Sequence, residues 1–195
     1  MLFTVFRGDS PQSIRLEGPR VFLLPPRMSD WKAWSGLREE SRDFLTPWEP
    51  TWPHDALTRH AFRRRLKAYN QEWRRGTGFS FLVHRLSDQA MMGGVTISNV
   101  RRGVAQAASI GYWIGERYAR QGFMSEAVSA VVEFAFEELA LHRVEAACLP
   151  SNDASRSLLL KVGFRQEGYA RQYLRINGKW QDHLLFEMLR DDPRL

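Results

Sequence analysis

The hydrophobic period of this chain changes near Gly122. Downstream, apolar residues recur every three or four positions between Ala127 and Leu139, which predicts a mostly buried helix of about five turns. A strand-like run follows at 143–148. Upstream, three short runs read as strands: 79–84, 91–99 and 107–114. Strands on both sides of a buried helix indicate an α/β domain.

The N-terminal half is expected to hold two more helices. One begins after Ser29 or Asp30, and a longer one, capped by Asp55, runs through Trp73. Between them, three prolines in seven residues predict a rigid aromatic loop without regular structure over 45–53.

The C-terminal part is expected to end in a helix and a hairpin. The helix is capped by Ser151 or Asn152 and stops at Gly163. Two strand-like runs then flank Asn177-Gly178, the dipeptide that most strongly predicts a two-residue hairpin turn.

The length of 195 residues fits one domain, and no internal repeat or linker divides the chain. Residues 1–19 carry little pattern and are expected to form a loose lead-in. A first strand is predicted at 20–24, which opens a single domain over 20–195.

The composition excludes several classes of protein. A hydrophobic share of 44% with 26% charged residues is an ordinary globular mixture, not a disordered or collagen-like one. The single cysteine, Cys148, cannot form an internal disulfide. No apolar run approaches the ~18 residues of a membrane span, and Met1–Phe6 lack the pattern of a secretory signal. A cytoplasmic location is therefore expected.

The excess positive charge is local. The chain carries 28 Lys and Arg against 22 Asp and Glu, a net charge of +6. Residues 59–75 alone contain seven basic residues and one Glu, which accounts for the whole excess. We expect this basic helix either to be a solvated face or to contact an anionic macromolecule such as RNA.

The segment that begins at Arg120-Gln121-Gly122 joins a strand to the long helix. A helix N-terminus presents unpaired backbone N–H groups and a positive dipole end, so it can hold phosphate oxygens. The turn lacks the lysine of a Walker loop and the three spaced glycines of a dinucleotide site. Taken by itself, this segment is a common strand-to-helix turn and does not indicate a phosphate site.

Several motifs in order make the chain resemble the GNAT superfamily of acyl-CoA N-acyltransferases. They are the strand Ile110–Gly115, Arg120-Gln121-Gly122, Asn152–Ser155 and Lys161–Phe164. Three further segments look like the RimJ-type ribosomal-protein-alanine N-acetyltransferases: Phe44–Pro50, Glu167–Ala170 and Asn177–His183. The resemblance covers about residues 20–190. It implies a three-layer α/β fold whose central mixed, mostly antiparallel sheet is flanked by helices.

The resemblance also implies acetyl-CoA as cosubstrate. Its pyrophosphate would sit on the turn from Ala119 to Met124, where Ala119 and Met124 depart from the family pattern and Gly122 keeps it. The pantetheine arm would follow the preceding strand and contact Asn152. The residues expected to bind acetyl-CoA are Tyr112, Trp113, Ile114, Arg120, Gln121, Gly122, Phe123, Met124, Ser125 and Asn152.

Catalysis is expected to be direct attack of an amine on the thioester, with no metal and no acyl-enzyme. Many relatives place a proton-donating tyrosine seven residues after the asparagine, but Leu159 stands there. Ser155 is the expected replacement, or else a helix-cap hydroxyl. Glu49 is the favoured base, with Glu167 and His183 as alternatives. Cys148 is expected to be a buried, inert thiol.

The leading function is acetylation of the N-terminal α-amine of a protein, a ribosomal one by resemblance. An α-amine has a pKa of ~8 against ~10.4 for lysine, so it fits a site with a poorly marked base better. A small-molecule amine acetyltransferase and a ribosome- or RNA-binding factor with vestigial catalysis remain alternatives.

Overall fold

The computed structural model describes residues 4–6 and 14–193, which form one nine-stranded mixed sheet. The strand order is β1-β2-β3-β4-β5-β6-β7-β9-β8, and every neighbouring pair is antiparallel except β6 and β7. The strands are β1 (Thr4–Phe6), β2 (Arg15–Glu17), β3 (Val21–Leu24), β4 (Phe79–Arg85), β5 (Met91–Arg101), β6 (Ala107–Ile114), β7 (Arg143–Cys148), β8 (Arg165–Ile176) and β9 (Lys179–Leu189).

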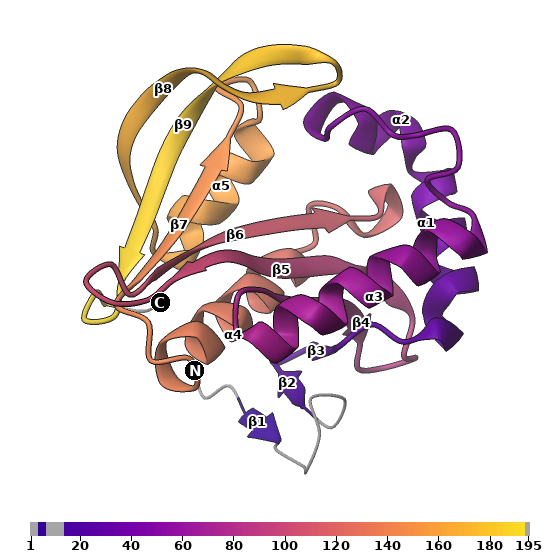
Figure 1. Cartoon of the computed structure of the whole chain (residues 1–195), viewed down its shortest axis with the longest axis horizontal. Coiled ribbons are helices and arrows are strands. Elements are labelled where there is room, and N and C mark those ends of the chain that lie inside the picture. The colour runs from indigo at the N-terminus through magenta and orange to yellow at the C-terminus, as the bar shows by residue number, and fades with distance from the viewer. Residues whose placement is uncertain (1–3, 7–13, 194–195) are drawn as a thin grey trace.

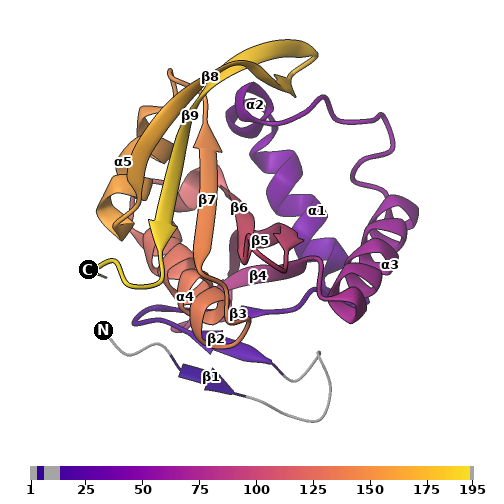
Figure 2. The same cartoon turned by 60° about the vertical axis from the view of Figure 1, so that its left-hand side comes forward.

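Helices cover both faces of this sheet (Figures 1 and 2), which confirms the predicted three-layer fold with a mixed, mostly antiparallel sheet. One layer holds α1, α2 and α3, and the other holds α4 and α5. Their bounds are α1 (Trp31–Glu40), α2 (Arg42–Leu45), α3 (Arg59–Arg75), α4 (Phe123–Glu137) and α5 (Asp153–Val162). Among the described residues, no helix is long and apolar enough to span a membrane.

Two phenylalanines of β4 connect α3 with α4. The Phe134 ring of α4 meets Phe79 and Phe81 edge-on, at centroid distances of 5.7 and 5.5 Å. Trp73 of α3 meets the same two rings at 4.9 and 5.4 Å. Each such aromatic pair contributes about 0.5–1.5 kcal/mol beyond its buried area. The cluster therefore fixes both helices relative to the sheet.

The two parallel strands diverge after a short contact. β6 and β7 pair only from Ala107↔Arg143 to Ser109↔Glu145. Beyond that point β6 continues along β5 as far as Ile114, while β7 continues along β9 (Figure 1). The sheet therefore opens in its middle, and one edge of β6 carries backbone groups that no neighbouring strand pairs.

The N-terminal lead-in, which we expected to be a loose segment, contains regular structure where it is described. Where the structure describes residues 1–19, Thr4–Phe6 and Arg15–Glu17 form β1 and β2, which extend the sheet beyond β3. Leu16 is 1% exposed and belongs to the core. Three-residue strands are too short to show a hydrophobic period, so no sequence pattern could indicate them. The rest of the lead-in, 1–3 and 7–13, lies outside the described residues.

Two local predictions in the N-terminal half were also wrong. The segment expected to be irregular from Leu45 contains the end of α2 and a 3-10 turn over Thr46–Trp48. Pro47 fits there because a first-turn residue needs no backbone N–H. The cap of α3 is Thr58, whose hydroxyl accepts from the Ala61 N–H at 3.1 Å, whereas Asp55 bonds Arg64 at 2.6 Å.

The contact between β5 and β6 predicts which glycines have a packing role. A Cβ on Gly93 of β5 would lie 2.2 Å from the Trp113 carbonyl oxygen, so Gly93→Ala must push β6 away. We expect it to lower the free energy of unfolding by about 1–3 kcal/mol in urea titrations. Gly36→Ala in α1 meets nothing within 4 Å and is expected to add up to about 1 kcal/mol. Equal effects of the two changes would show that space at Gly93 is not limiting.

Candidate active site

The turn before α4 presents an open helix N-terminus. Arg120 and Gly122 both have left-handed backbone, with φ of 60° and 84°. Gly122 is the N-cap of α4, and no side chain caps it. The first-turn N–H groups of α4 are therefore available to an anion, as a pyrophosphate requires.

Arg20 holds this turn against the sheet, and sequence reasoning did not identify it. Its Nε donates to Glu126 Oε1 at 2.6 Å, and one of its terminal nitrogens donates to the Gln121 carbonyl at 3.0 Å. The same guanidinium lies 4.6 Å from the Phe123 ring centroid. Arg20 and Glu126 stand 106 positions apart, so no sequence pattern could have indicated this contact.

A pair of hydroxyl groups lies on the α5 side of the open edge of β6. The Tyr112 hydroxyl and Ser155 Oγ are 2.7 Å apart. Asn152 is the cap of α5, because its Oδ1 accepts from the Ser155 N–H at 3.0 Å. Ser155 Oγ is therefore not the cap. Burial raises the pKa of Tyr112 well above its usual range, so its hydroxyl keeps its proton at neutral pH.

Cys148 lies at the end of β7 on the same side. It is 5% exposed, and burial raises the pKa of its thiol. Such a thiol is a poor nucleophile because the thiolate is the reactive form.

On the opposite side of β6 lies a pocket of about 380 Å³. Its lining comes from α1, the 49–57 loop, α3 and strands β4 to β6. Trp113 and its neighbour Tyr112 are both among the residues that line it. Because successive side chains of a strand point to opposite faces, Tyr112 and Trp113 put the hydroxyl pair and the pocket on either side of the same backbone.

An ion pair between a buried arginine and a partly buried glutamate shapes one wall of this pocket. Arg38 is 8% exposed and forms a two-pronged pair with the Glu49 carboxylate, to which Trp52 Nε1 also donates at 2.7 Å. The Arg38 guanidinium lies 4.4 Å from the Trp52 ring centroid and 4.7 Å from that of Trp113. The aromatic rings therefore already surround a cation that belongs to the protein.

The β8–β9 hairpin closes the same region. The Asn177 N–H at its tip donates to the Glu49 carbonyl at 2.9 Å, so the hairpin holds the loop that carries Glu49. Figure 1 shows the hairpin reaching across to α2.

Comparison with known proteins identifies the family. The family model described as "Acetyltransferase (GNAT) domain" matches residues 20–165. The chain belongs to the GNAT acetyltransferase family.

Three relatives extend this assignment. "Probable N-acetyltransferase YjcK" of Bacillus subtilis is 35% identical over 91% of this chain and 98% of its own. The "[Ribosomal protein uS5]-alanine N-acetyltransferase" of Escherichia coli is 33% identical over 96% of each chain. The solved "Mycobacterium smegmatis RimJ in complex with CoA-disulfide" is 32% identical, covers 96% of this chain and 85% of that one, and has a TM-score of 0.83.

The protein is thus an acetyl-CoA-dependent N-acetyltransferase, and the geometry fits that cosubstrate. The N-terminus of α4 is open to a pyrophosphate, and the unpaired edge of β6 at Tyr112, Trp113 and Ile114 can accept an extended arm. Asn152 uses its oxygen as a cap and keeps its amide N–H groups as donors. No group of metal-ligating side chains is found in the described part of the acetyltransferase.

The candidate bases lie in different places. Glu49 lines the pocket. Glu167 is paired with Arg143 at 2.5 Å, and His183 is 3% exposed with Nδ1 at 3.0 Å from the Gln181 carbonyl. Neither of these two residues lines the pocket, so Glu49 alone of the three meets it.

Gly122 is expected to be required for cosubstrate binding. Gly122→Ala must hold a left-handed backbone, at ~1–2 kcal/mol, and its Cβ would lie 3.0 Å from Arg20. We expect the Kd of acetyl-CoA in calorimetry to rise about tenfold as the helix start shifts. Gly103→Ala, equally left-handed but with nothing within 4 Å, should leave the Kd unchanged. An unaltered Kd in both variants would contradict binding at this turn.

Proposed function

We propose that this acetyltransferase modifies the N-terminal α-amine of a protein, a ribosomal protein, in the cytoplasm. The observation that carries the proposal is the pocket on one side of the open β6 edge, with the hydroxyl pair on the other. An amine in the pocket could reach a thioester laid along that edge. The uS5-alanine N-acetyltransferase relative supports the same class of acceptor.

The charge of the pocket favours a protein end over a small polyamine. Arg38 and Arg65 line it with one carboxylate, Glu49, and that carboxylate already pairs with Arg38. A polycation would find no free acidic group there, whereas a peptide offers carbonyl oxygens to guanidinium donors.

The reaction is a direct transfer. The neutral amine attacks the thioester carbon, the C–S bond breaks, and the amine loses a proton. Backbone N–H groups near Trp113 and Ile114 polarise the carbonyl. Ser155 donates a proton to the departing thiolate, Tyr112 returns one to Ser155 across their 2.7 Å contact, and water returns a proton to Tyr112 before the next turnover.

An α-amine acceptor needs less help from a catalytic base than a lysine side chain does. At pH 7 roughly one α-amine in ten is already neutral, against about one lysine in a few thousand. Glu49 stays the proposed base, through water, although three donors already occupy three of the about four lone-pair sites on its carboxylate. In this proposal, helix α3 docks the macromolecule that presents the amine.

The acceptor class can be tested with peptides. We expect a peptide with a free N-terminal alanine to be acetylated about 100-fold faster than an N-terminally blocked peptide with one lysine, by mass spectrometry. Its rate should rise from pH 6 to 8 as the amine loses its proton, and level off above. Spermidine serves as the small-amine control. Faster acetylation of spermidine would overturn the proposal.

The hydroxyl pair can be tested by a double-mutant cycle. We expect Ser155→Ala to lower kcat about 100-fold. Tyr112→Phe should lower it less, and the double variant should be no slower than Ser155→Ala, because the two groups act in series. The KM for acetyl-CoA should stay constant, and Tyr118→Phe, a buried tyrosine outside the pair, should have no effect. Losses that multiply would rule out the relay.

A further inference from the structure

Packing contacts fix the orientation of helix α3 about its own axis. Phe62, its one buried residue, packs on Trp34 of α1 at 4.9 Å, and Trp73 packs on β4. Leu66 is partly buried against the core between them. With about 100° per residue, the positions 59, 63, 67, 70 and 74 fall within an arc of about 80°. We call the side chains on this arc the basic stripe: Arg59, Arg63, Lys67, Asn70 and Arg74.

Two other basic residues of α3, Arg64 and Arg65, make contacts within the protein. Arg64 pairs with Asp55 at 2.6 Å. Arg65 donates to the Tyr69 hydroxyl at 3.2 Å, lies over the Trp34 ring and lines the acceptor pocket. By contrast, none of the four cations of the basic stripe takes part in an ion pair within the described residues. Most of the unpaired charge of the helix is therefore gathered on the stripe, and Arg75 lies outside it.

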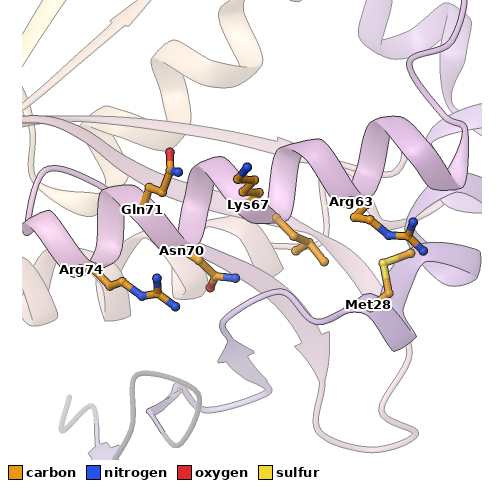
Figure 3. A pocket seen from close by; sticks show the side chains of 7 residues that line it. Met28, Arg63, Lys67, Asn70, Gln71 and Arg74 are labelled. Carbon is orange, nitrogen blue, oxygen red and sulfur yellow. The ribbon is translucent and has the colours of Figure 1, made fainter.

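The stripe borders a shallow groove of about 430 Å³. Figure 3 shows Arg63, Asn70 and Arg74 extending along one edge of the helix, and Lys67 and Gln71 along the other. Met28 and Leu66 complete the lining. The groove thus has an aliphatic floor and a rim of nitrogen donors.

We infer that the basic stripe binds the phosphodiester backbone of RNA. Arginine, lysine and side-chain amides are the groups that contact phosphate and sugar oxygens. Protein interfaces also use arginine and methionine, but they centre on aromatic anchors and are depleted in lysine, and no aromatic residue lines this groove. The choice of RNA over another polyanion rests on the proposed ribosomal acceptor.

The position of the stripe suits such a partner. The acceptor pocket takes Arg65 and Tyr69 from another side of the same helix, so bound RNA would leave the pocket free for a chain end. The phosphates of acetyl-CoA have their own place at the N-terminus of α4. The stripe is therefore not needed for the cosubstrate.

The test measures RNA binding without acetyl-CoA and without an acceptor. Fluorescence anisotropy of a labelled RNA hairpin is recorded over a range of KCl concentrations. The variant carries Arg59→Gln, Arg63→Gln, Lys67→Gln and Arg74→Gln. The matched control removes four exposed cations elsewhere, with Lys32→Gln, Lys161→Gln, Arg171→Gln and Lys179→Gln.

Loss of up to four phosphate contacts should reduce the slope of log K against log salt by about 3 in the stripe variant. The control should keep the slope of the parent. An unchanged slope in the stripe variant, or an equal loss in both, would overturn the inference. So would tighter binding of polyglutamate than of the hairpin, which would indicate an acidic protein partner instead.

The same variants separate this inference from the proposed function. The stripe variant should acetylate a short N-terminal peptide at the parent's kcat/KM, because the pocket and the α4 turn are untouched. If no peptide is acetylated by any form, the proposed function fails, while the RNA result still stands on its own. An equal loss of peptide acetylation and RNA binding would place the charge in the fold, against the inference.

Discussion

The divergence of β6 from β7 is the constraint on which the site depends. Three residue pairs hold the strands together, and beyond Ser109↔Glu145 each strand follows a different neighbour. A sheet normally satisfies its backbone groups by pairing, so an opening in its middle leaves donors and acceptors that need another partner. An extended thioester arm can supply that partner. Because Tyr112 and Trp113 point to opposite faces there, one backbone segment separates the hydroxyl pair from the proposed acceptor pocket.

Most of this architecture was predictable from local patterns. The buried period of α4, the stop at Gly163 and the hairpin at Asn177-Gly178 are set by residues within a few positions of each other, and the structure has them all. The short strands β1 and β2 were missed because three residues carry no period. Their place depends on pairing with β3, which is a tertiary property.

The site was predictable only in part, for the same reason. Gly122 and Asn152 could be identified from the sequence because a helix start needs a particular backbone conformation or a capping side chain. Arg38 gave no comparable signal, since an arginine in a helix usually lies in solvent. Its burial against Trp52 and Trp113 comes from three separate elements, and only the fold brings them together. The sequence could propose Glu49 but could not reveal that its carboxylate is already held.

The distribution of charge connects cosubstrate and partner. Residues 59–75 account for the whole net charge of +6, so the rest of the chain is neutral in sum. At the N-terminus of α4, Glu126 neutralises Arg20, and the anion site depends chiefly on backbone N–H groups. Backbone donors are fixed in direction and need no excess charge to hold a compact pyrophosphate. A long polyanion needs cations repeated along a line, which a helix provides at every turn. On the proposed assignments, different groups at different positions would bind the two kinds of anion: backbone N–H groups at the start of α4 the pyrophosphate, and side chains along α3 the RNA.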